Sequence, residues 1–379
     1  MTVVDKYAMP KLDFESPLVA TLFEIERLRA DIGTGDTPRD AFVELHQLFD
    51  LVMSVVSARI EGNHTTVYDA LDQIDASVGS SADQLREITN IAATARFIDS
   101  LPPEEPLTHN LIREIHRRVV DGLSREGDPT PGAYRVNEVA ITNSAHVPPT
   151  WVTVHPEMTS LLDFANESKP LHEQMLQIAV AHHRFVWIHP FRNGNGRVSR
   201  LFTYAMLRKT IFATRGFSAL NPTAVFGNDR DAYISALERA DGLTDAGTVA
   251  WAEFFVRGIR DDIARLLELQ RHSFVIDELV GPALESLRRD GLVSREEHAA
   301  LGEALKSGVV KAGDLEEIVP GTASHRSRFI RSLRDRSLLQ QAEEGPRFYR
   351  LSLARGPLAP RLIRRLDTLG YLPRMLSAD

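Results

Sequence analysis

The stretch HPFRNGNGRVSR, residues 189–200, decides how the surrounding chain is to be interpreted. Gly194 and Gly196 can take backbone angles closed to other residues, so the amides of this turn can converge on one point. The following VSRLFTYAMLRK has the apolar spacing of a helix, which places the turn at a helix N-terminus. Free N–H groups and the positive end of the helix dipole favour an anion there. The stretch therefore predicts a phosphate-binding turn.

Three side chains around this turn carry further chemistry. Arg197 and Arg200 are three positions apart, so they share one face of the first helical turn and can grip the same polyanion. His189 precedes the turn, and a neutral imidazole beside phosphates could accept a proton from an attacking hydroxyl. Each feature alone is most often an ordinary surface turn with solvated arginines. Together, in this order, they indicate a site for a di- or triphosphate with a base beside it.

Length and composition bound the class of protein. The 379 residues suffice for two or three domains, and 43% apolar with 25% charged residues is typical of a soluble globular protein. The chain has no cysteine, which excludes disulfides, thiolate metal sites and cysteine nucleophiles. The N-terminal residues lack an apolar signal region, and no apolar run approaches the roughly 18 residues of a membrane span. We therefore expect a cytoplasmic protein without membrane contact.

The apolar pattern predicts an all-α fold class, because helical spacing recurs almost throughout. The exception is residues 127–150, where Gly, Pro and Asn surround the β-favouring run RVNEVAI and predict a short β-hairpin flap. We expect a helical region at 1–106, a helical core at 107–269, and a separate domain with the C-terminal tail at 270–379.

The C-terminal part differs in charge from the rest. Residues 271–379 carry 18 Lys and Arg against 15 Asp and Glu, a net charge of +3, whereas the whole chain has −8. A helix, a turn at Pro320–Gly321, a basic helix and a β-ribbon follow one another, which is the pattern of a winged helix-turn-helix domain. Five arginines between 322 and 336 favour duplex DNA as a partner of residues 322–350. The alternative is a solvated helix in a protein-interaction domain.

A second short stretch, SARIEGN at residues 57–63, places Ser57 and Glu61 on one helical face. Gly62 and Asn63 follow as a helix C-cap. By itself this pattern is typical of a surface pair at the end of a helix.

The stretch 189–200 resembles the signature of the Fic family, His-Pro-Phe-x-(Asp/Glu)-Gly-Asn-Gly-Arg-x-x-Arg, and differs from it only at Asn193. LHEQMLQIAVAHHRFVWIHPF resembles the family's helix leading into the motif, and PGAYRVNEVAI resembles its flap, here around 136–148. DAYISALERAD resembles the segment that lines the nucleoside pocket, with Tyr233 at a matching tyrosine. The similarity covers about residues 40–265.

This resemblance implies transfer of a nucleoside monophosphate, usually AMP from ATP, to a Ser, Thr or Tyr hydroxyl of a target protein. His189 would be the base, and the flap would hold the target as an added strand. Arg197 would stabilise the departing pyrophosphate, and Arg200 would bind the γ-phosphate. The remaining phosphate contacts would come from Gly194, Asn195 and Gly196.

Asn193 stands where the family has an acidic residue that binds Mg²⁺. Its amide offers one neutral oxygen, a poorer ligand for a hard cation. Three outcomes are open: slower transfer with Mg²⁺ held by the phosphates, a different metal such as Mn²⁺ or a different donor, or loss of activity. We favour the first.

SARIEGN resembles the inhibitory helix of some Fic proteins, here about residues 41–63. The resemblance implies that Glu61 pairs with Arg200 and so blocks the γ-phosphate, with Ser57 and Asn63 belonging to the same motif. The expected function is an autoinhibited protein adenylyltransferase. The alternatives are a DNA-binding regulator with a weakly active or inactive Fic core, and a Fic enzyme that uses another donor or removes AMP. Whether the chain forms a homodimer stays open.

Overall fold

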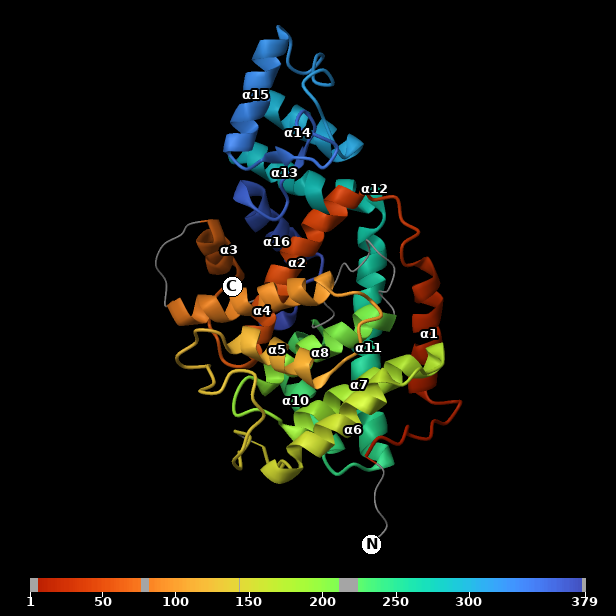
Figure 1. Ribbon diagram of the computed structural model, residues 1–379. Helices are drawn as coiled ribbons and strands as arrows, with labels where there is room; N and C mark the ends of the chain where they lie inside the picture. Colours follow the sequence, from red (N-terminus) through yellow and green to blue (C-terminus); the bar gives the residue numbers. More distant parts are fainter. Residues whose placement is uncertain (1–5, 76–81, 143, 211–223, 377–379) are drawn as a thin grey trace.

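The computed structural model describes residues 6–75, 82–142, 144–210 and 224–376, and over these ranges it is mostly helical (Figure 1). The all-α fold class is confirmed. The helices of the first 270 residues are α1 (Pro17–Asp31), α2 (Arg39–Ile60), α3 (Val67–Asp75), α4 (Ala82–Ser100), α5 (His109–Val120), α6 (Val154–Asn166), α7 (Leu171–Ile188), α8 (Asn195–Thr210), α9 (Ala224–Asn228), α10 (Arg230–Ala240) and α11 (Asp245–Leu269).

The C-terminal part begins with a broken helix and contains a small sheet. Its elements are α12 (His272–Phe274), a π-helical turn (Val275–Val280), α13 (Gly281–Arg289), α14 (Arg295–Ser307), α15 (Ala323–Asp335), β1 (Leu339–Gln341), β2 (Tyr349–Leu351) and α16 (Ala359–Thr368). Short 3₁₀ turns lie at Trp151–Thr153, Gly356–Leu358 and Arg374–Leu376. β1 and β2 pair antiparallel, with Gln340 opposite Arg350.

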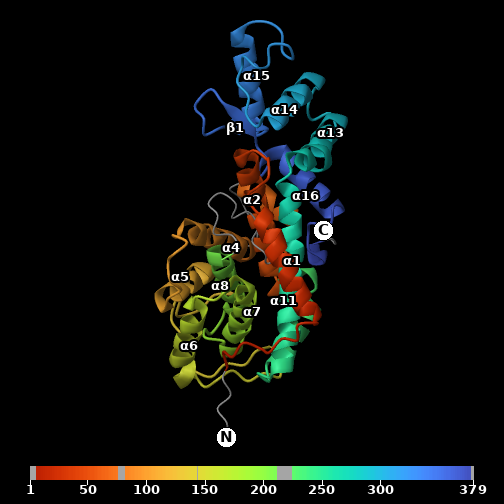
Figure 2. The ribbon, with the colours of Figure 1, turned by 90° about the vertical axis from the view of Figure 1, so that its right-hand side faces the viewer.

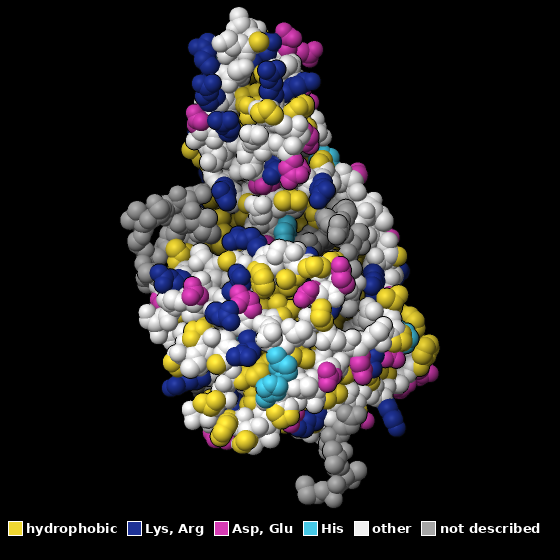
Figure 3. All heavy atoms as spheres, viewed as in Figure 1, with side chains coloured by type: hydrophobic (Ala, Val, Ile, Leu, Met, Phe, Trp, Pro, Cys, Tyr) yellow, Lys and Arg dark blue, Asp and Glu magenta, His cyan; other side chains and the backbone are white. Residues whose placement is uncertain are grey.

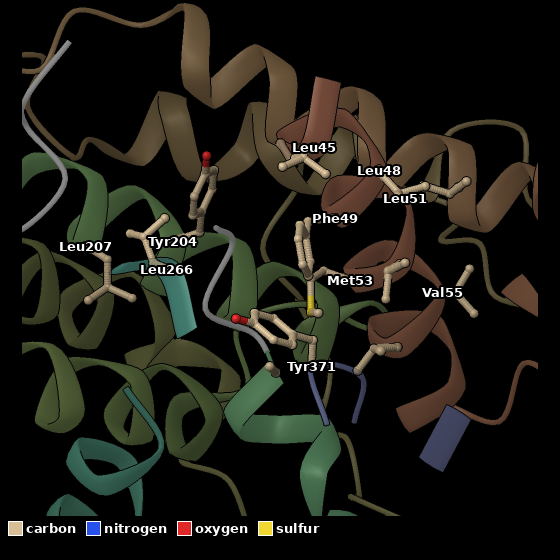
Figure 4. Close-up of a cluster of buried hydrophobic side chains, with 14 of the residues drawn as sticks. Leu45, Leu48, Phe49, Leu51, Met53, Val55, Tyr204, Leu207, Leu266 and Tyr371 are labelled. Atoms are coloured by element: carbon tan, nitrogen blue, oxygen red, sulfur yellow. The ribbon is translucent and has the colours of Figure 1, made fainter. Parts of the chain in front are cut away.

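α2 lies in the middle of the molecule and packs on α4, α8 and α9. It is long and apolar enough to cross a membrane, but 78% of its most apolar window is buried inside the protein, so its apolar residues form a core. Phe49 and Met53 point into this core, where Tyr371 lies beside them (Figure 4). α2 therefore packs against residues near the C-terminus of the chain.

α7 and α8 pack against each other and, with α5, α6 and α11, hold the 189–196 turn (Figure 1). α7 ends where His189 takes a left-handed conformation, with φ of 51°. Gly194, with φ of 75°, reverses the chain, and α8 starts at the next residue. Both conformations turn the chain sharply, so His189 and the amides of Gly194 to Gly196 lie at adjoining helix ends.

α13, α14, α15 and the two-stranded sheet project from one end of the molecule (Figures 1 and 2). α14 contacts α13 and β2, and α15 contacts β1. The chain then returns toward the helical core, where the Tyr371 ring lies 6.4 Å from the Phe49 ring of α2. The division into domains at 106 and 269 stays a prediction.

The β-hairpin flap expected within residues 127–150 is wrong, because the described residues of this segment form an irregular loop without strand pairing. Side chains hold the loop instead of a strand partner. Arg135 donates hydrogen bonds to the carbonyls of Asn137, Pro149 and His189. His146 donates to the Trp187 carbonyl at 2.9 Å. These contacts fasten the loop to the end of α7.

Candidate active site

The turn at 189–196 is fixed by its own side chains. The Asn195 amide accepts a hydrogen bond from the Phe191 N–H at 2.8 Å and donates to the Phe191 carbonyl at 2.9 Å. His116 of α5 stacks on Phe191, with ring centroids 3.8 Å apart, and donates to the Asn193 carbonyl at 3.2 Å. Asn195 thus holds the turn by contacts within it, and His116 holds it from α5. The amides of Gly194 and Gly196 lie at the start of α8.

His189 has the properties of a neutral base. Burial lowers its pKa to about 4, although the backbone of Val186 and the Glu61 carboxylate oppose that shift. The imidazole is therefore uncharged near pH 7 and can accept a proton. Its backbone is held by Arg135, whose Nε donates to the His189 carbonyl at 2.8 Å.

Arg200 is buried and held by the end of α2. Its Nε donates to Ser57 Oγ at 2.9 Å, and its Nη2 donates to the Ser57 carbonyl at 2.8 Å. Nη2 also lies 2.8 Å from Glu61 Oε1. Burial raises the pKa of Glu61, but Arg200 and Arg197 outweigh burial and hold that pKa below the ordinary glutamate value. Glu61 is therefore an ionised partner of Arg200.

The Glu61 carboxylate lies directly over the glycine turn. A Cβ on Gly196 would fall 2.0 Å from Glu61 Oε1 and 3.2 Å from Arg200 Nη1. A carboxylate so close to a helix N-terminus takes the place that an anionic ligand would use. Gly196 is thus needed for close approach of an acidic group, whether that group is a side chain or a phosphate.

Arg197 is also occupied. Its Nη1 lies 2.8 Å from Glu87 Oε1 on α4, and its Nη2 donates to the Glu126 carbonyl at 2.9 Å. Asn63, just after α2, donates to Glu87 Oε2 at 2.8 Å. Asn63 therefore joins the end of α2 to the α4 carboxylate that holds Arg197.

Sequence reasoning missed Glu87, Glu126 and His116. They lie on α4, on the 121–150 loop and on α5, and no spacing relates them to the 189–200 motif. A cavity of about 270 Å³ beside Glu61 is lined by Asp83, Glu87 and Glu126 and by Arg125 at its edge. The approach to the glycine turn is consequently acidic.

The surroundings of Asn193 do not fit a protein-held Mg²⁺. Its Oδ1 accepts the Gly194 N–H at 2.7 Å, and its Nδ2 donates to the Gly127 carbonyl at 3.3 Å. The nearby carboxylate of Asp128 is buried and accepts hydrogen bonds from Thr130 and the Asn193 N–H. Both side chains are committed to the turn, whereas Mg²⁺ needs oxygen ligands with free lone pairs.

Tyr233, expected in a nucleoside pocket, lies in an aromatic core. It is 3% exposed, and its hydroxyl is 3.0 Å from His182 Nε2. Its ring lies 5.0 Å from the Phe226 ring and 6.0 Å from the Trp251 ring. The structure thus brings His189, the glycine turn and the two arginines together with Ser57, Glu61 and Asn63, and it encloses Tyr233 behind them.

The curated proteins most similar in sequence share one name. A "Protein adenylyltransferase Fic" of Nematostella vectensis is 28% identical over 191 residues, which are 49% of this chain and 42% of that protein. One of Drosophila willistoni is 31% identical over 220 residues, 56% of this chain and 40% of that protein. The chain therefore spans less than half the length of these two relatives.

Solved structures share the fold at lower identity. A Fic family protein from Desulfovibrio desulfuricans has a TM-score of 0.57 at 22% identity, covering 91% of this chain and 98% of that one. A Fic domain containing signaling protein from Bacteroides thetaiotaomicron has a TM-score of 0.52 at 19% identity, covering 66% and 97%. Residues 106–207, which include α5 to α7 and the 189–200 motif, match the Fic/DOC family. By this match and by the 189–200 motif, the chain is similar to the Fic/DOC family, and it shares the fold of solved Fic proteins.

Proposed function

We propose that this protein is an adenylyltransferase that transfers AMP from ATP to a hydroxyl of a target protein, and that Glu61 holds it inactive. The observation that carries the proposal is the Glu61–Arg200 contact of 2.8 Å over a helix N-terminus, with a neutral His189 at the preceding helix end. The names of the curated relatives support AMP as the group transferred.

In the proposed reaction the triphosphate lies over the start of α8. The Asn195 and Gly196 amides bind the α- and β-phosphates, joined by the Gly194 amide if its N–H exchanges Asn193 Oδ1 for a phosphate oxygen. Arg200, once released by Glu61, binds the γ-phosphate. The His189 imidazole takes the proton of the target hydroxyl, whose oxygen attacks the α-phosphorus. The bond from that phosphorus to the bridging oxygen breaks, and pyrophosphate leaves with Arg197 stabilising its charge. Any Mg²⁺ would enter on the phosphates, because Asn193 and Asp128 are committed to the turn.

The inhibition follows from charge and space. The Glu61 carboxylate and the γ-phosphate need the same guanidinium, and two anions at that distance repel each other. The acidic cavity beside Glu61 adds to this repulsion. ATP therefore binds productively only when the end of α2 moves or loses its carboxylate.

Replacing Glu61 by Gly is expected to raise labelling from ATP that carries a labelled α-phosphate about tenfold or more above wild type. Labelling of the protein itself and labelling of lysate proteins are both measured. Adding His189→Ala to the Glu61→Gly protein should abolish both. The matched control is Glu167→Gly, since Glu167 is also a helix C-cap but is exposed and lies on α6. Unchanged labelling in the Glu61 variant would contradict inhibition by Glu61. Labelling from UTP but not from ATP would show that the donor is UTP.

A second candidate function is DNA binding by a winged-helix domain formed by α13, α14, α15 and the sheet. A cavity of about 570 Å³ between α15 and β2 is lined by Lys311, Arg331, Arg334 and Arg347. Lys and Arg side chains gather over this projecting end of the molecule (Figure 3). Two of the five α15-region arginines are engaged elsewhere: Arg326 is buried against Gly321, and Arg336 pairs with Glu297. Fewer arginines are therefore free to contact DNA than the five counted between residues 322 and 336.

DNA binding by the whole chain is expected to weaken steeply with salt, because each phosphate contact releases counterions. Arg331→Ala with Arg334→Ala should lower the affinity for duplex DNA about tenfold and flatten the salt slope by about two contacts. Arg364→Ala with Arg374→Ala, away from the cavity, serves as the control pair. Fluorescence anisotropy measures DNA binding by wild type and by the two double variants. If the cavity variant and the control pair bind duplex DNA equally well, DNA binding at this cavity is contradicted, and protein interaction becomes the favoured role of the C-terminal part.

A further inference from the structure

Three side chains of metal-binding type converge away from the candidate active site. His46 and Asp50 lie one turn apart on α2, and Asp99 comes from the last turn of α4. His46 Nε2 is 3.4 Å from Asp50 Oδ2 and 3.5 Å from Asp99 Oδ2. One ligand-type atom from each residue lies within 4.8 Å of the other two. The three donors therefore face a common centre.

Their spacing suits a shared ion better than hydrogen bonds. An N–H···O hydrogen bond spans about 2.7–3.2 Å, which is shorter than either contact of His46 Nε2. One ring nitrogen also carries one proton at most, so it cannot donate fully to two carboxylates. By contrast, a tetrahedral zinc site with bonds of about 2.1 Å places neighbouring ligand atoms about 3.4 Å apart.

The outer contacts orient Asp99 as a ligand. Tyr204 of α8 donates its hydroxyl proton to Asp99 Oδ1, and Arg208 Nε lies 3.3 Å from the same oxygen. Asp99 Oδ2 is thereby turned toward His46. A carboxylate whose second oxygen is hydrogen-bonded in this way is the usual arrangement around a protein metal ligand.

Asp50 supplies an independent observation. It is 3% exposed, and its Oδ1 has no hydrogen-bond partner among the described residues. A buried carboxylate normally requires a partner or a metal. Asp50 also lines a cavity of about 230 Å³, together with Gln47 and Arg96.

We propose that His46, Asp50 and Asp99 bind a divalent first-row transition ion, with Zn²⁺ as the best fit to one imidazole and two carboxylates. Water completes the tetrahedron. The ion would fasten α2 to α4. The end of α2 carries Glu61, and α4 carries Glu87, so the two helices that occupy the site's arginines would be held in fixed register. The binding itself does not depend on the transfer activity.

The test uses the whole chain stripped with a chelator and titrated with Zn²⁺ by calorimetry. Wild type should bind one equivalent that His46→Gln loses, and the metal should raise the Tm of wild type but not of His46→Gln. Tyr204→Phe, which removes the donor to Asp99, should weaken binding by about tenfold. The control is His298→Gln, because His298 also faces a carboxylate at 3.4 Å, that of Glu285.

Equal Zn²⁺ binding by wild type and His46→Gln would overturn the proposal, as would the absence of any bound equivalent in wild type. Circular dichroism of the stripped proteins checks that each variant folds. Should His46→Gln fail to fold, Co²⁺ added to wild type gives a second measurement. Intense visible absorption from a four-coordinate site supports the assignment, and the weak spectrum of six-coordinate Co²⁺ contradicts it.

Discussion

The glycine turn can serve only one anion at a time. Gly196 leaves room for the Glu61 carboxylate at a distance that excludes even a methyl group, and the same carboxylate takes Arg200. A phosphate arriving at α8 therefore meets an occupied helix terminus and an occupied guanidinium. Removing one side chain should release both, which is why a single substitution is expected to change activity so strongly.

His189 gives a prediction of pH dependence. In the proposed reaction the neutral form of His189 is the active one. Burial lowers its pKa to about 4, so the neutral form persists down to that pH and is lost as pH falls through it. The labelling rate at low ATP, measured with Glu61→Gly, should stay level from pH 6.5 downward and halve at or below pH 4, because this variant lacks the carboxylate that raises the pKa of His189. Circular dichroism and recovery on return to pH 7 separate protonation from unfolding. An acidic limb centred near 6.5 would contradict the assignment of this histidine.

The residues that could be predicted from the sequence are those whose relation is local. His189, Gly194, Asn195 and Gly196 follow one another in the chain, so backbone geometry alone places them together. The pairing of Glu61 with Arg200 needed a family resemblance, because α2 and α8 meet only through tertiary packing. Glu87 and Asp128 had neither kind of signal, and they are the residues that decide whether Arg197 and Asn193 are available.

At the scale of elements, the end of α2 holds Arg200 through two hydrogen bonds to Ser57 as well as through Glu61. Ser57 accepts from Arg200 Nε through its hydroxyl and from Nη2 through its carbonyl, one helical turn before Glu61. The side chain contributes one of these bonds, and the helix backbone contributes the other. Removing the Ser57 hydroxyl alone should therefore weaken the hold of α2 on Arg200 only in part.

Ser57→Ala is expected to raise labelling about fivefold, less than Glu61→Gly, because it removes one hydrogen bond worth about 1 kcal/mol. The control is Ser54→Ala on the same helix, since the Ser54 hydroxyl bonds only the Asp50 carbonyl of its own helix. The measurement is the initial rate of label incorporation at equal protein concentration. A rise of the same size in both variants would assign the effect to α2 stability instead.

Helices were predictable and the flap was not, for one physical reason. A helix satisfies its own backbone hydrogen bonds, so apolar spacing suffices to place α7 and α8. A strand needs a partner strand, and the described residues of the 127–150 loop have none; the Arg135 guanidinium instead bonds the carbonyls of Asn137, Pro149 and His189. The β-favouring run RVNEVAI gives no indication of these contacts.

At the scale of the whole molecule, α2 spans from the C-terminal sheet to the glycine turn. Arg350 of β2 pairs with Asp40 at 2.6 Å and lies 3.5 Å from Glu44. Glu61 at the other end of α2 lies about 25 Å further along the helix. One helix therefore carries an ion pair to the sheet near its start and the contact with Arg200 at its end.

The ion pairs at the sheet end should contribute strongly to stability. Arg350, Asp40 and Glu44 are 13%, 14% and 4% exposed at their side chains. Arg350→Ala would leave two largely buried carboxylates without their cation, which costs about 3 kcal/mol of unfolding free energy. Urea denaturation at pH 7 measures the loss. Arg347→Ala, an exposed position on the same ribbon, is the control and should change stability by less than about 0.5 kcal/mol.

Neutralising the two acids tests the cause of that loss. Asp40→Asn with Glu44→Gln in the Arg350→Ala protein removes the unpaired charges and should restore most of the lost free energy, because neutral amides cost less to bury than carboxylates. If the triple variant stays as unstable as Arg350→Ala, then packing of the arginine stem, rather than charge, holds the sheet to α2. The contact between sheet and helix would then be insensitive to salt.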